Sequence, residues 1–296
     1  MSAAERLCGP HAALRPALAH LRGAPSRTWS LVITFFGDAV VPRGGDVSLA
    51  ALLTFFDAVG IAPGVVRTAL SRLTADGWLI RDRAGRTSRY RLAERGLETF
   101  RDAEARIYSA RPPQWSGAFT LLHAGESGLD EGARAALAAA GFGAPSPGVW
   151  IAPPGVRVPD EAAGALVLSA AGESEANRAL AARAWPPERG RRAYEAFLTA
   201  FSPLRRFLAE GKSLAGLDAL AARVLLVHAY RRILLGGPDL PPELLAPDWP
   251  GAAARALCAE IYPLLLAPSE AWLDANVLDD KGGRTRAAPQ IATRIR

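Results

Sequence analysis

The sequence predicts a multidomain α+β protein, and three observations support that prediction. The chain has 296 residues, more than a single hydrophobic core usually organises. Helix and strand patterns alternate before Pro186, whereas only helical patterns follow it. Half of the residues are hydrophobic and 22% are charged, which is typical of folded domains. We therefore predict five segments: a mobile N-terminal arm (1–26), a compact α+β domain (27–110), a middle α/β domain (111–186), an all-helical C-terminal domain (187–276) and a disordered tail (277–296).

The domain at 27–110 is expected to begin with a buried helix at Trp29–Phe36, where apolar residues lie on nearly every side. The proline and glycines of 42–45 favour a turn, and a short strand follows at Val47–Leu49. A second helix spans Leu49–Val59. Pro63 then suits the first turn of a third helix, because its missing N–H would have no helical partner there. A hairpin and a long amphipathic helix at Glu94–Tyr108 complete the domain.

The third helix and the hairpin after it form the most basic stretch of the chain. Residues 65–91 contain seven arginines against two aspartates, which could account for nearly all of the formal net charge of +6. The apolar residues of the helix share one face, and its polar residues lie on the opposite face. The apolar set is Val66, Ala69, Leu70 and Leu73, and the polar set is Arg67, Thr68, Ser71 and Arg72. Arginine can bind guanine O6 and N7, and hydroxyls can meet base edges or phosphates, so the polar set is suited to the DNA major groove.

The hairpin contributes a second group of arginines. Its strands, Trp78–Arg81 and Arg89–Leu92, flank a turn at 84–86. We expect the hairpin arginines to contact backbone phosphates or to enter a minor groove. They are Arg81, Arg83, Arg86, Arg89 and Arg91. A helix followed by a basic two-stranded wing is typical of a winged helix-turn-helix DNA-binding domain; the alternative is a solvated amphipathic helix and hairpin with no nucleic-acid partner.

The middle domain shows an alternation of strands and helices. The expected elements are a strand at Trp115–His123, a helix at Glu131–Ala140, strands at Gly148–Ala152 and Ala165–Ser169, and a helix at Glu175–Ala184. This order predicts a small split βαβ layer of the ferredoxin-like type.

The residues after Pro186 are predicted to be helical. The expected helices are 191–210, 217–235, 251–266 and 269–276. The most apolar run, Val224–Leu235, is interrupted by His228, Arg231 and Arg232 and is too short to cross a bilayer. We therefore expect no membrane partner.

The overall charge and the cysteine content limit which partners and which cellular compartment we expect for this protein. The pI near 9.9 comes almost wholly from arginine, because Lys212 and Lys281 are the only lysines. Such basicity favours anionic partners, although genomic base composition could produce the same bias. Cys8 and Cys258 make neither a metal motif nor a disulfide framework, and residues 1–25 lack the apolar core of a signal peptide. We expect a cytoplasmic protein that is associated with the nucleoid when it binds DNA.

Several stretches of the sequence closely resemble the PaaX family. They lie at 29–45 (WSLVITFFGDAVVPRGG), 66–73 (VRTALSRL), 77–79 (GWL), 106–108 (RIY), 223–239 (RVLLVHAYRRILLGGPD), 241–245 (PPELL), 248–251 (DWPG) and 272–273 (WL). The resemblance extends from about Trp29 to Trp272 and is strong at both ends, whereas the middle domain matches mainly in layout.

This resemblance implies a repressor of phenylacetic acid degradation operons, with an N-terminal winged helix, a ferredoxin-like middle domain and a helical C-terminal domain. It also implies a homodimer on an inverted-repeat operator in double-stranded DNA, released by an aryl-acyl-CoA, with phenylacetyl-CoA the usual inducer. Only the positions of the recognition helix, at 67, 68, 71 and 72, carry over residue by residue.

Catalytic, metal and cofactor motifs are not found in the sequence. His228 lies inside an apolar helix, where a hydrogen-bonded core histidine is more common than a catalyst. The sequence at 210–213 resembles the end of a phosphate-binding loop, but position 206 is Arg where that motif needs Gly. We therefore expect no enzyme and no cofactor. The alternative is a nucleic-acid processing enzyme or nuclease-like factor that uses the ferredoxin-like middle domain.

Three arginine pairs lie in the helical region, at 191–192, 205–206 and 231–232. Guanidinium groups suit phosphate oxygens, which a CoA effector would supply. Solvated helix faces are the simpler interpretation of such pairs. Arg231 and Arg232 interrupt an otherwise apolar helix, so they are our first candidates for effector contacts.

Overall fold

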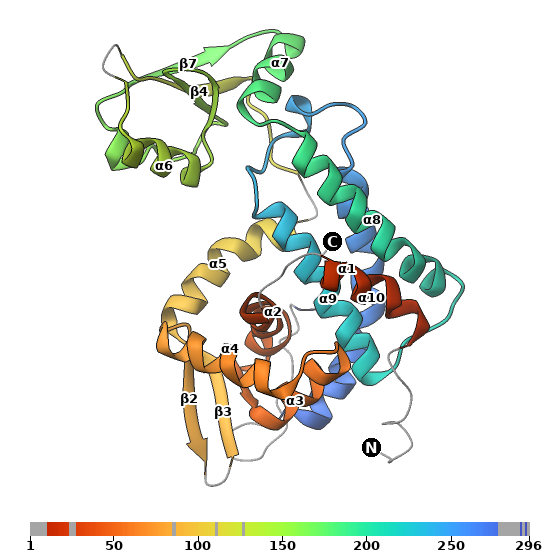
Figure 1. Cartoon of the computed structure of the whole chain (residues 1–296). Coiled ribbons are helices and arrows are strands. Elements are labelled where there is room, and N and C mark those ends of the chain that lie inside the picture. The colour runs from red at the N-terminus through yellow and green to blue at the C-terminus, as the bar shows by residue number, and fades with distance from the viewer. Residues whose placement is uncertain are drawn as a thin grey trace. The chain divides into compact units, whose positions relative to one another are not determined.

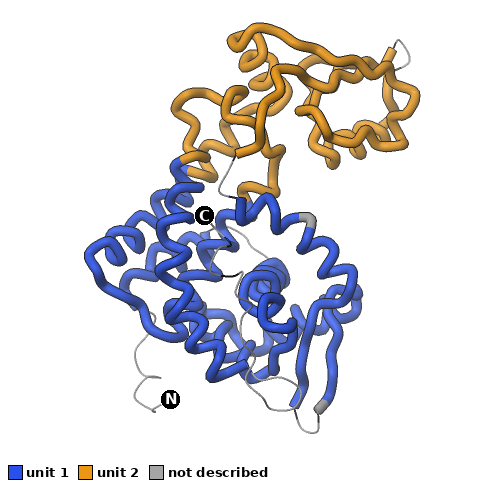
Figure 2. Tube along the Cα trace, turned by 180° about the vertical axis from the view of Figure 1, so that it is seen from behind, with its two compact units in different colours: residues 1–110, 195–232, 253–296 blue, residues 111–194, 233–252 orange. Residues whose placement is uncertain are grey.

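The computed structural model of the chain describes residues 11–23, 28–84, 87–109, 112–125, 128–277, 291 and 294. The chain divides into two compact units (Figure 2). Unit 1 comprises residues 1–110, 195–232 and 253–296, and unit 2 comprises residues 111–194 and 233–252. Unit 1 thus unites the N-terminal α+β segment with C-terminal helices for which the sequence predicts a separate domain.

The first 109 residues of unit 1 alternate short helices with three strands, in nearly the order expected from the sequence. The elements are η2 (Ala12–Leu14), α1 (Arg15–Gly23), α2 (Thr28–Phe35), the π-helical η3 (Phe36–Val40), η4 (Val41–Arg43), β1 (Asp46–Ser48), α3 (Leu49–Ala58), α4 (Pro63–Ala75), β2 (Leu79–Ala84), β3 (Thr87–Leu92) and α5 (Glu94–Tyr108).

The N-terminal arm differs from the expectation of a mobile segment. Residues 12–23 form η2 and α1, and Leu14, Ala17 and Leu18 are buried. These residues have the i, i+3, i+4 spacing of one helix face, which explains why the segment packs rather than moves. The rest of the arm, at 1–10 and 24–26, lies outside the described residues.

Helix α2 occupies the centre of unit 1, with α4, α5 and α9 around it (Figure 1). Its Phe35 ring lies 4.5 Å from the Phe55 ring of α3, centroid to centroid. Both rings are fully buried, as the apolar composition of Trp29–Phe36 predicts. This packing also fixes α3 beside α2, and α3 begins at Ser48, whose hydroxyl caps it by accepting from the Ala51 N–H.

The three strands of unit 1 form an antiparallel sheet of order β1-β3-β2. Val47 pairs with Tyr90, and Leu79 pairs with Leu92. All four are buried, so they form the row by which the sheet joins the core. The turn of the hairpin, at 85–86, lies outside the described residues.

Three long helices complete the described helical part of the chain. They are α8 (Glu188–Ala209), α9 (Gly216–Leu234) and α10 (Gly251–Asn276). Two helices were expected at 251–266 and 269–276, but α10 continues through Pro263 and Pro268. A proline inside a helix costs about 3 kcal/mol; here a buried face that includes Ile261 and Leu265 offsets that cost.

The tail after residue 276 was expected to be disordered. Its described residues are Val277, Ile291 and Arg294, and both Val277 and Ile291 are buried. Arg294 forms an ion pair with Glu104 of α5. The expectation therefore fails at these three positions, and residues 278–290, 292–293 and 295–296 lie outside the described part.

Unit 2 contains a four-stranded sheet with a helix on each face. Its elements are β4 (Ala118–His123), α6 (Glu131–Ala140), β5 (Gly143–Ser146), β6 (Val149–Ala152), η5 (Asp160–Ala162), β7 (Leu166–Ala171), α7 (Ser174–Ala184) and η6 (Pro242–Leu244), besides parts of α8 to α10. The strand order is β5-β6-β4-β7, with every neighbouring pair antiparallel. Strands β4 and β5 therefore run in the same direction with β6 between them, as in a split βαβ unit.

Helices α6 and α7 lie where the sequence predicts helices, but their placement on the sheet differs from that in a ferredoxin-like layer. Phe119 and Ile151 pack with Ala181 of α7, whereas Leu122 and Ala152 pack with α6. Because alternate strand residues face opposite sides of a sheet, α6 and α7 cover opposite faces. Between β6 and β7 the chain forms only the short η5, where a ferredoxin-like layer would have its second helix. Among the described residues, no helix is both long enough and apolar enough to span a membrane.

Candidate nucleic-acid interface and buried arginine clusters

The outer face of α4 carries the four residues that the sequence assigned to DNA recognition. Arg67, Thr68, Ser71 and Arg72 are all exposed. The opposite face is buried through Val66, Ala69, Leu70 and Leu73. Helix α4 begins at Pro63, as expected, and the Thr68 hydroxyl donates to the Gly64 carbonyl oxygen at 3.0 Å. The structure therefore brings the four side chains together on one exposed face.

This face has no local counter-charge. Helix α4 contains no aspartate or glutamate, and none of the ion pairs among the described residues involves Arg67 or Arg72. The nearest carboxylate in sequence is Asp76, at the C-terminal end of the helix. Two exposed guanidinium groups without a protein partner can bind phosphate or base acceptors at little cost in broken contacts.

The hairpin arginines divide between the two faces of the sheet. Arg81 pairs with Tyr90, and Asp82 pairs with Arg89. Because directly paired residues share a face, Arg81 and Arg83 extend the buried row of Leu79 toward the tip of the hairpin, where they are exposed. Arg81 also donates to the Ser88 hydroxyl at 2.8 Å.

The other face of the hairpin is largely neutralised. Arg89 is only 8% exposed and pairs with Asp46 of β1 at 2.7 Å. Arg91 is exposed but pairs with Asp82 at 3.2 Å. A buried, paired guanidinium cannot reach a phosphate. Arg89 therefore joins two strands and does not contact DNA. Arg86 lies outside the described residues.

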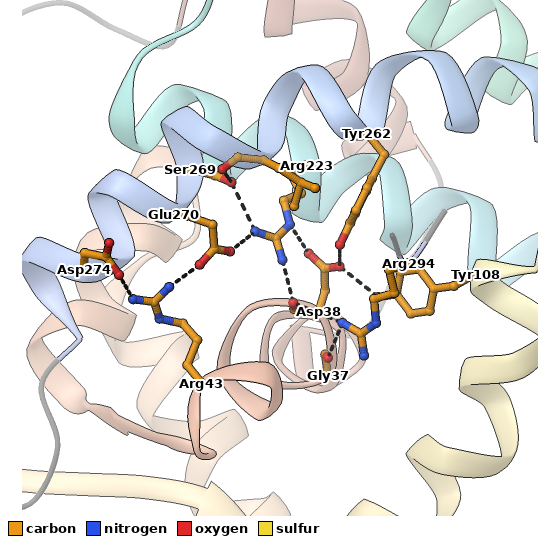
Figure 3. Close-up of polar contacts among 11 residues, drawn as sticks. Gly37, Asp38, Arg43, Tyr108, Arg223, Tyr262, Ser269, Glu270, Asp274 and Arg294 are labelled. Atoms are coloured by element: carbon orange, nitrogen blue, oxygen red, sulfur yellow. Dashed lines mark hydrogen bonds and ion pairs between the residues drawn. The ribbon is translucent and has the colours of Figure 1, made fainter. Parts of the chain in front are cut away.

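A buried cluster that the sequence did not suggest surrounds Asp38, which lies in η3 (Figure 3). Its carboxylate pairs with Arg223 of α9 at 2.7 Å, and both side chains are fully buried. The hydroxyls of Tyr108 and Tyr262 each donate to Asp38 Oδ1 at 2.8 Å. Asp38 therefore connects η3 with α5, α9 and α10 inside unit 1.

The cluster continues along α10 (Figure 3). Arg223 also donates to the Ser269 hydroxyl at 3.1 Å and to Glu270 at 2.5 Å. Glu270 in turn pairs with Arg43, whose second partner is Asp274. Each buried guanidinium in this cluster thus faces at least one carboxylate.

Burial and the Asp38 charge govern proton binding in this cluster. Burial raises the pKa of Tyr108 well above its ordinary value, and Asp38 raises it further. Burial and Asp38 act in the same direction on the pKa of Tyr262. Burial lowers the pKa of Arg223, but Asp38, Tyr262 and Glu270 outweigh that effect and raise it above the ordinary value. Both phenols therefore stay protonated and Arg223 stays charged at neutral pH, so the cluster suits structure rather than proton transfer.

A second buried cluster lies where α9 contacts α2. Arg231 donates from Nε to the Thr34 hydroxyl at 2.7 Å and from Nη2 to the Ser30 carbonyl and hydroxyl oxygens at 2.8 and 2.9 Å. The Thr34 hydroxyl also lies 2.9 Å from His228 Nδ1. Arg231 is therefore held toward the protein interior, whereas Arg232, the other predicted effector contact, is exposed.

The sequence contains one signal for the Asp38 cluster. Asp38 is the single charged residue in the apolar stretch at 29–42, and an acid in such a stretch must find buried partners. The partners themselves come from residues far along the chain, so no local pattern could name them. Among the described residues, no group of three or more His, Cys, Asp or Glu could hold a metal ion.

Comparison with known proteins first defines the class. A protein of Escherichia coli (strain K12) named Transcriptional repressor PaaX is 36% identical over 264 residues, which are 82% of this chain and 81% of that protein. That name describes a regulator of transcription rather than an enzyme.

Family models then define the family. The model described as PaaX-like protein matches residues 27–96, and the model described as PaaX-like protein C-terminal domain matches residues 185–275. The chain belongs to the PaaX family, as its sequence resemblance predicted. The first match contains α2 to β3 with the exposed face of α4, and the second contains α9 with Arg223 and Arg231.

Proposed function

We propose that this chain is a transcriptional repressor that binds double-stranded operator DNA through a winged helix formed by α2 to β3. The exposed, uncompensated polar face of α4 is the observation that carries this proposal. The relative named as a transcriptional repressor supports the regulatory role. A repressor acts on chromosomal DNA, so we expect the chain in the cytoplasm and at the nucleoid.

The order of elements supports the winged helix. Helix α2, strand β1, helices α3 and α4, and the β2–β3 hairpin follow one another, and β1 adds to the hairpin in the order β1-β3-β2. In such a domain the second helix of the helix-turn-helix enters the major groove, which here is α4. The hairpin then lies beside it as the wing.

The proposed DNA contacts are a smaller set than the sequence suggested. On α4 they are Arg67, Thr68, Ser71 and Arg72, facing base edges. On the hairpin they are Arg81 and Arg83, facing phosphates. Arg86 remains a predicted contact. Arg91 would have to break its ion pair with Asp82 before it could bind a phosphate. Arg89 is not proposed as a contact, because it is buried against Asp46.

A gel-shift titration on the DNA around the gene's own promoter tests the proposal. Arg67→Ala or Arg72→Ala should cost about 1–3 kcal/mol and relax base preference, because each removes a base contact. Arg83→Ala should weaken binding to all sequences alike and flatten the salt dependence by about one unit of slope. Arg178→Ala is the matched control, since Arg178 is an exposed arginine on α7.

Unchanged DNA binding in all three variants would overturn the assignment of this surface.

The same titration tests the effector. We propose release by an aryl-acyl-CoA such as phenylacetyl-CoA, which would make the chain a regulator of aromatic acid catabolism, so adding that thioester should free the DNA. If the protein binds the operator but does not respond to the thioester, only the effector proposal is overturned.

We further infer that the repressor is a homodimer on an inverted repeat, as two recognition helices one DNA turn apart would require. The edge strand β7 in unit 2 supports this inference. Its Leu166, Val167 and Leu168 are 59%, 49% and 48% exposed, and β7 contains no charged residue. Because these neighbours face both sides of the sheet, neither face of the strand is covered. The strand order of unit 2 agrees with a ferredoxin-like sheet, although α6 and α7 cover opposite faces of this sheet.

An uncharged, apolar edge strand favours pairing with another strand, and pairing with its own copy is self-complementary. Val167→Lys should therefore shift the sedimentation of the protein from dimer toward monomer. The control is Arg178→Ala, which removes an exposed charge of α7 in the same unit. A dimer unaffected by Val167→Lys would rule out β7 as the interface.

A further inference from the structure

Arg231 is a largely buried arginine for which the described residues supply no ion pair. Among the described residues, Arg43, Arg89, Arg223 and Arg294 are each buried or nearly so, and each pairs with aspartate or glutamate. Arg231 is different. All three of its hydrogen bonds go to neutral oxygens, on Ser30 and Thr34, and no ion pair among the described residues includes it.

The side chains that lower the pKa of the histidines beside Arg231 are all basic. Burial, Arg231 and Arg232 together lower the pKa of His228 to about 3. Burial and Arg232 lower the pKa of His20. Burial lowers the pKa of Arg231 to about 10, and the one group that acts in the opposite direction is the phenol of Tyr108. No carboxylate is among the groups that shift the pKa of His228, His20 or Arg231.

His228 supplies an independent sign of a missing partner. The side chain is 2% exposed, and its Nδ1 is occupied by the Thr34 hydroxyl. Its Nε2 is fully buried and has no hydrogen-bond partner among the described residues. A buried polar atom without a partner costs free energy that a bound group could recover.

Arg231 keeps one route to such a group. The Nε and Nη2 atoms of Arg231 donate hydrogen bonds to α2. The Nη1 atom makes no hydrogen bond with the described residues, and it is not fully buried. Nη1 therefore remains open to solvent while the rest of the guanidinium is fixed. A fixed guanidinium with an open N–H edge is preorganised for an oxyanion, because little side-chain freedom is left to lose.

We propose that Arg231 and His228, positioned by Ser30 and Thr34 of α2, form an oxyanion site that takes a carboxylate or phosphate group of a small molecule. The site deepens the proposed effector response, on which its biological role rests, by naming where an anionic group binds. The anion would neutralise Arg231 and allow His228 to take up a proton at Nε2. Binding of the anion at α9 would affect α2, the central helix of the winged helix, through Thr34.

Histidine NMR of the full chain tests the site without DNA. The four histidines, at 11, 20, 123 and 228, give few imidazole signals. Adding inorganic phosphate, with chloride at equal ionic strength as reference, should move the His228 and His20 signals with a saturable dependence on concentration. The signal of His123, in unit 2, should not move. A parallel titration with acetate tells whether the site prefers a phosphate or a carboxylate.

Arg231→Met is the decisive variant, with Arg178→Met as the matched loss of one arginine. Arg231→Met should weaken the phosphate-dependent shift of His228 at least tenfold, and Arg178→Met should leave it unchanged. Absence of a saturable shift with both anions in the wild-type chain, or an equal response in Arg231→Met, would overturn the site. If Arg231→Met fails to fold, His228→Gln replaces it, read out through His20. Operator binding without any anion response would overturn this inference and leave the proposed repressor intact.

Discussion

Two arginines of helix α9 show how differently one fold can treat the same side chain. Arg223 is fully buried and faces Asp38 and Glu270. Arg231, about two helical turns further on, is also largely buried but faces only hydroxyl and carbonyl oxygens of α2. Both fasten α9 to the segment 30–38, so packing alone does not explain the difference in counter-charge.

The difference separates a structural cluster from a binding site. Around Asp38 each buried guanidinium faces a carboxylate of the protein, so its charge needs no external anion. Arg231 forms no ion pair with the described residues, so no ion pair offsets the desolvation of its charge. An arrangement of that kind costs stability unless an external anion completes it.

The largest expected effect comes from the same substitution at both positions. Arg223→Met leaves the Asp38 carboxylate buried without its counter-ion and should lower the free energy of unfolding by about 3–5 kcal/mol. Arg231→Met strands no carboxylate and loses only hydrogen bonds to neutral acceptors, so it should stay within about 1 kcal/mol of the wild type. Native-state hydrogen exchange of the α9 amides reports both values on the same helix.

Equal losses in the two variants would show that Arg231 is as structural as Arg223. A gain of stability in Arg231→Met would strengthen the contrast, because it would mean that the unmatched charge is an active cost. Asp160→Ala serves as the reference for an exposed ion pair, with Arg157 as its partner. It should leave the exchange of α9 unchanged, since exposed pairs contribute little.

Local patterns in the sequence predicted most elements of the fold. Helices α5 and α6 have the expected bounds, and α4 exposes the polar face that its 3.6-residue periodicity indicated. These elements depend on residues close together in the chain. The PaaX family membership, too, followed from contiguous stretches of sequence.

The features that escaped prediction depend on contacts between distant residues. Asp38 finds Arg223 from 185 positions away, and Arg89 finds Asp46 across two strands. The hairpin shows the limit most clearly, because counting its arginines gave one basic group, whereas strand register divides them into an exposed pair and a neutralised face. The short strand β5 was also missed, since its sequence, Gly143–Ser146, has no apolar alternation.

The smaller expected effect is a pH dependence of the free energy of unfolding, which we expect from the cluster around Arg231 and not from the cluster around Asp38. The pKa of His228 is lowered from 6.5 to about 3 in the folded chain, by burial first and then by Arg231 and Arg232. The unfolded chain therefore binds more protons between those values, so stability is lost as pH falls below about 6.5, by up to about 1.4 kcal/mol per pH unit. His20, with its own lowered pKa, adds to the slope in the same direction.

His228→Asn should remove most of that acid slope, because an asparagine does not titrate and can still meet the Thr34 hydroxyl. Exchange of α9 amides at about pH 6.5 and pH 4.5 measures the slope, and His123→Asn in unit 2 is the control that should keep it. Phosphate should flatten the slope of the wild-type chain, since a bound anion favours the imidazolium that the bare cluster disfavours. An acid slope that persists unchanged in His228→Asn would mean that the unmatched cluster does not govern stability, and the contrast with Asp38 and Arg223 would then rest on geometry alone.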